Sequence, residues 1–309
     1  MARGWRWLLL LIPAALLGQV QQQSPSTAYI GSNVCRTCHP DIWSTFYKNP
    51  HFKSIASGKL PPDRTGCEGC HGPGKAHVEA RGGKTTIPHA FSLMSEPQIL
   101  DACLRCHAPD FGKANIRRSV HTQNDVVCTA CHSIHHSPTP RHLLAKPQTD
   151  LCYTCHGNIR AHFEMPSKHR VNEGFMDCSD CHNPHGAFAP TWRMGQRPRM
   201  VEQAITNQEA CLKCHVDKVG PFVYEHPSVA IEGCEQCHNP HGSMNAKLLV
   251  RPVVFTLCLE CHNGSAGGTR NLGVDIQSAR HNLLDPKFRQ CTTCHVRIHG
   301  SNADQYFLR

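Results

Sequence analysis

Ten copies of the pattern Cys-x-x-Cys-His account for all 20 cysteines of this 309-residue chain. Disulfide frameworks, zinc ribbons and redox motifs also use spaced cysteines, but none of them requires histidine directly after the second one. With 24 histidines in the chain, the chance of histidine at all ten positions is about 10⁻¹¹. Covalent haem attachment does require it, because two thiols form thioethers and the adjacent histidine ligates the iron. The pattern predicts ten haem c groups.

The attachment residues predicted by this pattern form ten cysteine pairs, each closed by one proximal iron ligand. The cysteines are Cys35, Cys38, Cys67, Cys70, Cys103, Cys106, Cys128, Cys131, Cys152, Cys155, Cys178, Cys181, Cys211, Cys214, Cys234, Cys237, Cys258, Cys261, Cys291 and Cys294. The proximal histidines are His39, His71, His107, His132, His156, His182, His215, His238, His262 and His295.

The other histidines follow the motifs in a regular order, which divides the chain into five two-haem repeats, at about 35–77, 103–135, 152–185, 211–241 and 258–299. One extra histidine lies between the two motifs of each repeat: His51, His121, His169, His226 and His281. Another follows the second motif: His77, His135, His185, His241 and His299. These ten residues are the predicted distal ligands, one for each iron. Two histidines at every iron predict lower potentials than a histidine–methionine pair.

The sequence spacing between His182 and His185 indicates which haems the distal ligands serve. A histidine three residues after a proximal ligand cannot reach the opposite face of the same haem, so we expect it to serve a neighbour. We expect the histidine after the second motif to serve the first haem of its repeat, and the intervening histidine to serve the second. His136 is an alternative to His135, and His162 to His169. His89, His142 and the methionines Met94, Met165, Met176, Met194, Met200 and Met244 fit surface or packing roles better.

The N-terminus indicates export. Arg3 and Arg6 precede an apolar run that ends near Gly18, so residues 1–18 are predicted to be a secretory signal peptide, followed by a mature cytochrome domain over 19–309. The formal net charge of +9 does not indicate nucleic-acid binding. Ten haems would bring about twenty propionates, and Lys and Arg are their natural counter-charges.

Local patterns predict short helices without a sheet. Residues 41–47 form a candidate helix with aromatic side chains on one face, ended by Asn49-Pro50. Capping boxes at residues 95–98 and 206–209 predict helices that lead into two of the motifs. Elsewhere 23 Gly and 22 Pro break the chain into turns. The predicted fold class is a multihaem cytochrome c, mostly short α-helices and loops around a haem chain, with little or no β-sheet.

Beyond the motif count, several strings resemble the periplasmic decahaem cytochromes of the MtrA and DmsE type. Cys67 begins CEGCHGPGKAH, Cys152 begins CYTCHGNIRAHFEMPSKH, and Cys234 begins CEQCHNPHGSMNAKLL. The resemblance implies closely spaced haems with two-histidine ligation in the periplasm. It also implies insertion into an outer-membrane β-barrel and exchange of electrons with other multihaem cytochromes. One departure is Lys168 before His169, where paired histidines are expected.

The expected function is therefore electron transfer, without a catalytic residue, a small-molecule substrate or a nucleic-acid partner. The resemblance directs it to a conduit for extracellular respiration. Two alternatives use the same residues. A soluble periplasmic shuttle needs the same haem sites, and a multihaem reductase would need one iron with an open face. Since all ten motifs end in histidine, and distal histidines are sufficient in number, the reductase is the weaker alternative.

Overall fold

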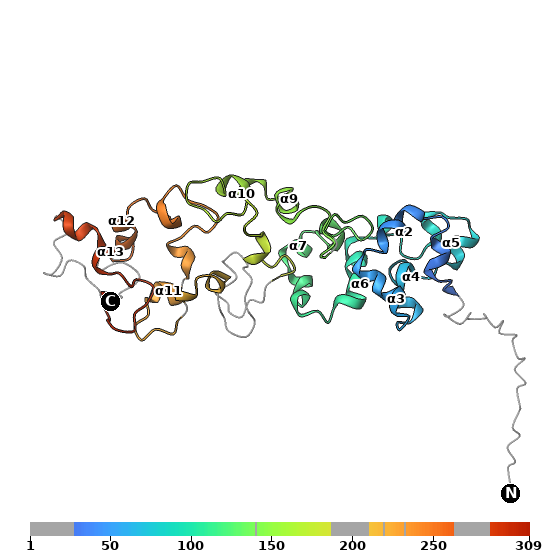
Figure 1. The fold of residues 1–309 in the computed structure, drawn as a ribbon, viewed down its shortest axis with the longest axis horizontal. Helices are drawn as coiled ribbons and strands as arrows, with labels where there is room; N and C mark the ends of the chain where they lie inside the picture. The colour runs from blue at the N-terminus through green and yellow to red at the C-terminus, as the bar shows by residue number, and fades with distance from the viewer. Residues whose placement is uncertain (1–27, 140, 187–209, 219, 232, 263–284) are drawn as a thin grey trace, which may run out of the picture. The chain divides into compact units, whose positions relative to one another are not determined.

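The computed structural model describes residues 28–139, 141–186, 210–218, 220–231, 233–262 and 285–309. Short helices joined by irregular segments make up these ranges (Figure 1), and none of their residues belongs to a β-strand. Backbone pairing between distant segments is limited to isolated β-bridges such as Ser167 with Ser243 and Tyr224 with Ser301. The predicted fold class is confirmed. The predicted signal peptide, the capping box at 206–209 and His281 lie outside the described residues.

The α-helices in the described ranges are short. They are α1 (Ser32–Cys35), α2 (Pro40–Phe46), α3 (Lys53–Ser57), α4 (Gly66–His71), α5 (Lys75–Glu79), α6 (Glu96–His107), α7 (Val120–Gln123), α8 (Cys128–Cys131), α9 (Gln148–Tyr153), α10 (Gly157–His162), α11 (Pro227–Ile231), α12 (Val254–Leu259) and α13 (Cys291–Cys294).

Many connections contain a turn of 3₁₀ helix. These turns are η2 (Pro50–Phe52), η3 (Pro62–Arg64), η4 (Lys84–Thr86), η5 (Phe91–Leu93), η6 (Phe111–Lys113), η7 (Ile116–Arg118), η8 (Cys178–Asp180), η10 (Ala210–Lys213), η11 (Val216–Lys218), η12 (Cys234–Gln236), η13 (Ala246–Leu248) and η14 (Pro286–Arg289). None of the described α-helices is both long enough and apolar enough to cross a membrane.

The chain forms two compact parts. The first contains residues up to Pro40 together with Lys53–Leu93, and the second contains Asp41–Phe52 together with Met94–Arg309. In the first part, the buried carboxylate of Glu68 accepts backbone hydrogen bonds from Ile30 (3.0 Å), Gly31 (2.8 Å) and Gly74 (2.8 Å). Three charge-assisted bonds to one side chain fix two loops against α4.

In the second part, α6 is the longest helix described, at 12 residues. Its first turn has the predicted capping box, in which Ser95 and Gln98 bind each other's backbone. The helix buries Ile99, Leu100 and Leu104 and carries the Cys103 motif at its C-terminal end. The other predicted helix also forms, as α2, and ends before Asn49. Both expectations are confirmed because cap and stop signals act locally.

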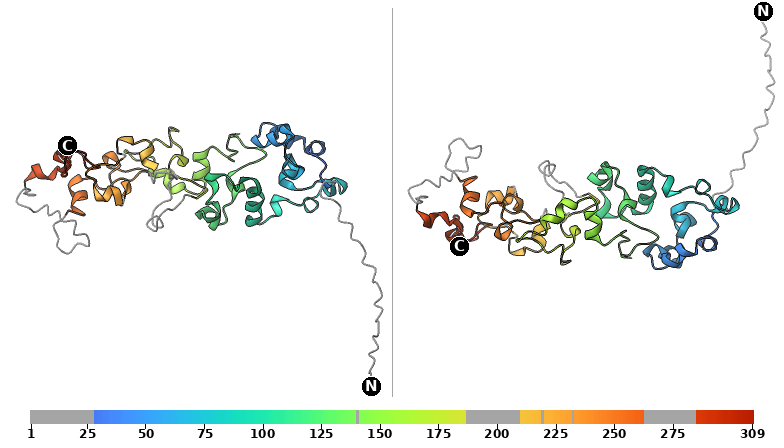
Figure 2. Two further views of the ribbon diagram at one scale, coloured as in Figure 1. Left: turned by 90° about the horizontal axis from the view of Figure 1, so that it is seen from below. Right: turned by 90° about the horizontal axis from the view of Figure 1, so that it is seen from above.

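Apolar side chains form only a small core. The buried ones are Phe46, Ile99, Leu100, Leu104, Ile116, Val127, Leu143, Phe163, Val171 and Ala210, and none of the described large side chains is fully enclosed. Figure 2 shows the same short elements from two further directions. The described residues thus bury little apolar surface for a chain of this length.

Candidate haem attachment and ligand sites

Each motif adopts one turn of helix, which is the conformation its chemistry requires. Residues at i, i+3 and i+4 lie on one face of a helix, so one helical turn places both cysteines and the histidine on the same side. Two motifs lie within α4 and α6. In the other eight, the histidine N–H donates to the carbonyl of the first cysteine, at 2.8–3.0 Å; these histidines are His39, His132, His156, His182, His215, His238, His262 and His295.

Within a repeat, the first cysteines of the two motifs lie together. Cys35 donates a hydrogen bond to Cys67, which lowers the pKa of the Cys67 thiol to about 6. Cys103 lowers the pKa of Cys128 to about 6 in the same way, and Cys152 lowers that of Cys178 to about 7. In the last repeat, burial and then the charge of Cys291 raise the pKa of Cys258 to about 12. In the first, second, third and fifth repeats, the first cysteines of the two motifs therefore lie in contact.

Between repeats, the second motif of one lies near the first motif of the next. The Cys131 thiol has a raised pKa, first from burial and then from the charge of Cys155. Burial and the charge of Cys211 raise the pKa of Cys181, and burial and the charge of Cys261 raise that of Cys237. Contacts within a repeat and contacts between repeats therefore alternate along the chain.

Among the described residues, eight motif histidines each face a histidine ring, and every partner is one of the predicted distal ligands. The pairs are His39 with His77 (6.3 Å between ring centres), His51 with His107 (5.9 Å), His121 with His156 (6.2 Å), His132 with His185 (6.2 Å), His169 with His215 (6.4 Å), His182 with His241 (5.8 Å), His226 with His262 (6.2 Å) and His238 with His299 (6.2 Å). Two imidazoles bound to opposite faces of one metal ion, with nitrogens at about 2.0 Å, place their ring centres about 6 Å apart. The spacing fits an iron between each pair.

Among the described pairs, the ring contacts match the expected pairing within a repeat only for His39 and His77. His51 lies against His107 of the next repeat rather than serving the second motif of its own. Likewise His185 lies against His132 of the preceding repeat. The same displacement by one repeat holds for the remaining pairs. Its physical cause is backbone contact between repeats, which the spacing of histidines along the sequence does not reveal.

These backbone contacts also determine which ring nitrogen of the intervening histidines carries the proton. His121 Nδ1 donates to the Pro184 carbonyl (3.0 Å), and His169 Nδ1 donates to the Pro240 carbonyl (2.8 Å). A carbonyl oxygen only accepts, so the proton must sit on Nδ1, and Nε2 keeps the lone pair that a metal needs. His51 reaches an equivalent carbonyl through Asn49, whose side chain binds His51 Nδ1 (3.0 Å) and the Ile134 carbonyl.

Burial lowers the pKa of eight candidate ligands, which favours their neutral form. It is the first cause of the lowered pKa of His51, His71, His132, His226, His241, His262 and His299. For His185 the same cause, followed by the charge of His132, lowers the pKa to about 4. A neutral imidazole can bind a metal without first losing a proton.

The histidines outside the predicted sets have other partners. The His89 carbonyl accepts from His71 Nδ1 (2.9 Å) and the His142 carbonyl accepts from His132 Nδ1 (2.8 Å), so both support a motif through the backbone. His136 contacts the ring of His135. His169, not its alternative His162, faces His215.

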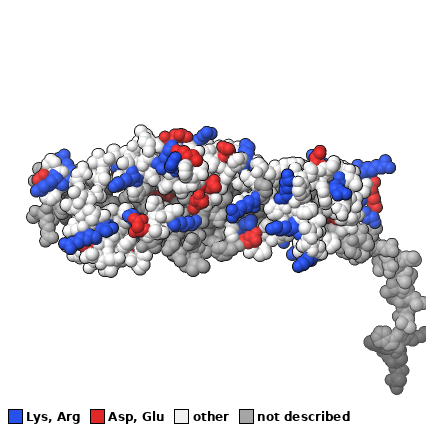
Figure 3. Space-filling model, viewed as in Figure 1, with Lys and Arg blue, Asp and Glu red and all other residues white. Residues whose placement is uncertain are grey.

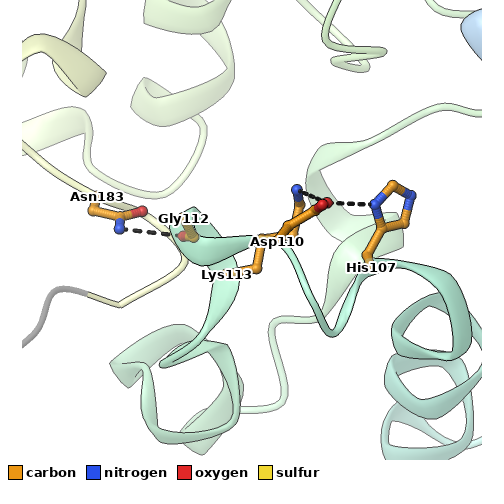
Figure 4. A network of polar contacts seen from close by, with 5 residues as sticks. All are labelled: His107, Asp110, Gly112, Lys113 and Asn183. Atoms are coloured by element: carbon orange, nitrogen blue, oxygen red, sulfur yellow. Dashed lines mark hydrogen bonds and ion pairs between the residues drawn. The ribbon is translucent and has the colours of Figure 1, made fainter.

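Two acidic side chains at the motifs were not foreseen. Glu68 lies between the cysteines of its own motif, as described above. Asp110 accepts a hydrogen bond from His107 Nδ1 (2.8 Å) and pairs with Lys113 (2.7 Å), as Figure 4 shows. An acidic residue three positions after a motif histidine is the only sequence signal for the second, and it is common on surfaces. On the face seen in Figure 3, Lys and Arg are scattered among acidic residues and form no continuous basic patch.

Two family models match parts of the chain: the doubled CXXCH motif at residues 120–161 and 226–267, and cytochrome c554 and c-prime at residues 75–133. Multiheme cytochrome MtrA of Shewanella baltica is 34% identical over 278 residues, which cover 88% of this chain and 79% of that protein. C-type polyheme cytochrome OmcC of Geobacter sulfurreducens is 27% identical over 199 residues, which cover 57% of this chain and 24% of that longer protein.

Proposed function

Because this chain belongs to the MtrA family of multihaem c-type cytochromes, we propose that it transfers electrons through ten covalently attached haems, each held between two histidines. As a member of that family it is an electron carrier, not an enzyme. The observation that carries the proposal is the set of eight ring pairs. Each joins a motif histidine to a distal candidate at 5.8–6.4 Å.

The chain's own residues perform three tasks in this proposal. The 20 cysteines would tether the porphyrins, and the two histidines of each pair would hold one iron, which leaves no coordination position for a substrate. The alternating contacts between cysteines of successive motifs bring neighbouring attachment edges together. When bound, haem supplies the ferric/ferrous couple that carries the electron.

Two motif histidines, His71 and His295, and two distal candidates, His135 and His281, complete the proposed count of ten. His71 Nδ1 donates to a backbone carbonyl, as does His295 Nδ1 to the Tyr306 carbonyl (2.5 Å). Because Nδ1 carries the proton in both rings, Nε2 holds the lone pair that a metal needs.

The proposed setting is the periplasm, after removal of residues 1–18, with the cytochrome inserted in an outer-membrane β-barrel. There it would pass electrons between periplasmic donors and other multihaem cytochromes, as a conduit for extracellular respiration. The support is the family membership and the extent of the match, which covers 88% of this chain.

The first test is haem quantification and low-temperature electron paramagnetic resonance on the oxidised full-length protein. The proposal expects ten haems per chain, all low-spin. A high-spin share of about one in ten would reveal an iron with an open face and favour a reductase.

The setting needs a separate test. Membrane fractionation, with and without a co-expressed outer-membrane barrel, should place the cytochrome in the outer membrane only when the barrel is present. Recovery in the soluble periplasmic fraction in both cases would replace the conduit with a shuttle.

A further inference from the structure

His107 differs from the other motif histidines in what its Nδ1 binds. His71, His132, His238 and His295 donate to backbone carbonyls. His107 donates to a carboxylate oxygen of Asp110, at 2.8 Å. Among the described hydrogen bonds of motif histidines, this is the one with a carboxylate acceptor.

The local backbone holds this carboxylate in place. His107 ends α6, and the Asp110 N–H donates to the His107 carbonyl (3.2 Å) in the turn that follows. The Lys113 N–H then donates to the Asp110 carbonyl (2.9 Å), closing η6. Asn183 reaches the same turn through the Gly112 carbonyl (3.4 Å; Figure 4). These backbone hydrogen bonds hold Asp110 in the turn beside His107, where its carboxylate reaches the imidazole.

We propose that Asp110 is a positioning residue that lowers the reduction potential of the haem attached at Cys103 and Cys106. This inference rests on the proposed function, in which His107 and His51 ligate that iron. A carboxylate is a stronger acceptor than a carbonyl and draws the Nδ1 proton further from the ring. The imidazole then donates more electron density to the iron, which stabilises the ferric state.

Lys113 is a second partner of the Asp110 carboxyl. The hydrogen bond from Lys113, followed by that from His107, lowers the pKa of the Asp110 carboxyl to about 2. Lys113 also shares the negative charge, since its Nζ lies 2.7 Å from the oxygen that binds His107. The lysine therefore moderates the effect, and removing it should strengthen the influence of Asp110 on the imidazole.

The ring geometry separates this haem from those with nearly parallel histidine rings. The rings of His51 and His107 cross at 90°, whereas four other pairs lie within 11–21° of parallel. Perpendicular imidazoles leave two iron d orbitals nearly equal in energy, which produces a highly anisotropic low-spin resonance. Parallel rings produce a rhombic one. The His107 haem should therefore contribute to the highly anisotropic signal.

The experiment is a redox titration of the full-length holoprotein, followed by electron paramagnetic resonance at each poised potential. In Asp110→Asn, one component of the highly anisotropic signal should be reduced at higher potential. The expected change in its reduction equilibrium is about tenfold, or about 59 mV for a one-electron couple. Asp110→Glu, which restores the carboxylate, should return the component toward its wild-type potential.

Asp217→Asn is the matched control. Asp217 lies two residues after His215 and pairs with Lys218 (2.6 Å), and no hydrogen bond joins these two described residues, Asp217 and His215. Asp217→Asn removes the same charge near a motif histidine without removing a hydrogen bond to that histidine. The largest shift in reduction potential in Asp217→Asn should be below a third of the shift in Asp110→Asn.

Two results would overturn the inference: an unchanged titration in Asp110→Asn, or an equal shift in Asp217→Asn. If Asp110→Asn loses its haem, the inference is tested with Lys113→Gln instead, and Lys218→Gln is the control for that variant. The Lys113 variant should lower the potential of the same component, and no change there would refute the inference. Haem count and spin state, measured on wild-type samples, test the proposed function separately. Ten low-spin haems without a shift would reject only the role of Asp110.

Discussion

The imidazole of His121 donates its Nδ1 proton to the carbonyl of Pro184, the residue immediately before His185. His121 faces His156, and His185 faces His132. One hydrogen bond therefore connects two candidate ligand pairs. His169 and Pro240 repeat the arrangement one repeat later. The distal histidines of neighbouring sites are thus positioned together by one stretch of backbone.

Replacing His121 with Ala should open one iron and leave the others six-coordinate. We expect about one tenth of the haem to become high-spin, because the ring that faces His156 is lost. Electron paramagnetic resonance and the high-spin charge-transfer absorption band would measure the change. His142→Ala is the control, because the substitution keeps the backbone carbonyl of His142 that accepts from His132 Nδ1. A fully low-spin His121→Ala protein would show that this histidine is not a ligand.

Replacing Glu68 with Ala should destabilise the first compact part. Three backbone N–H groups would lose their acceptor, and each buried donor left unsatisfied costs about 1 kcal/mol or more, so the total should be about 3 kcal/mol. Thermal unfolding and limited proteolysis near Ile30 would detect the loss. The exposed Glu79, at the end of α5, provides the control Glu79→Ala, which should change stability by less than about 0.5 kcal/mol. Equal melting temperatures for the two variants would contradict the role of Glu68.

Gly242 has no room for a side chain. An added Cβ would lie 1.9 Å from the carbonyl oxygen of His162, so Gly242→Ala must displace the backbone next to His241. A cost of about 2 kcal/mol or more is expected, together with a changed resonance from the haem that His241 serves. Gly157, in α10, has open space around it. Gly157→Ala should be neutral or stabilising by up to about 1 kcal/mol. Melting followed by circular dichroism would rank the two, and the reverse order would refute the steric argument.

Stability should fall on acidification below neutral pH. The pKa of His185 is about 4 in the folded chain and near 6.5 when unfolded, mainly because of burial. Between these values the unfolded state binds more protons, so stability rises with pH. The contribution is complete above pH 6.5 and is lost as the pH falls toward 4. Melting temperatures at pH 8, 7, 6, 5 and 4 should be level at first and then decline. An increase between pH 6.5 and 5 would contradict this assignment of sign.

The sequence was sufficient for features that depend on neighbours along the chain. The attachment motifs require one helical turn each, and the cap at Ser95 and the stop at Asn49-Pro50 act within a few residues. All eight partners of the motif histidines were among the predicted distal residues. Their regular order in the sequence is the signal that singled them out, and their role as ligands stays a prediction.

The pairing itself could not be read from the sequence. His121 and Pro184 are 63 positions apart, and only the folded backbone brings them together. The spacing of three residues between His182 and His185 excluded a shared haem but left the direction of the displacement open. Asp110 escaped notice for a related reason. An exposed acidic residue near a motif is ordinary until its oxygen is found beside His107.

Seven of the eight described ring pairs join histidines of successive repeats, so each of these candidate sites needs residues from two repeats. A cut between the third and fourth repeats would separate His169 from His215 and His182 from His241, leaving two half-sites on each side. The boundary between the fourth and fifth repeats has the same two kinds of pair, His226 with His262 and His238 with His299. Insertion of one whole repeat at such a boundary would therefore regenerate complete sites on both sides. In the proposed function, duplication of one repeat would lengthen the chain of haems by two without a new kind of ligand.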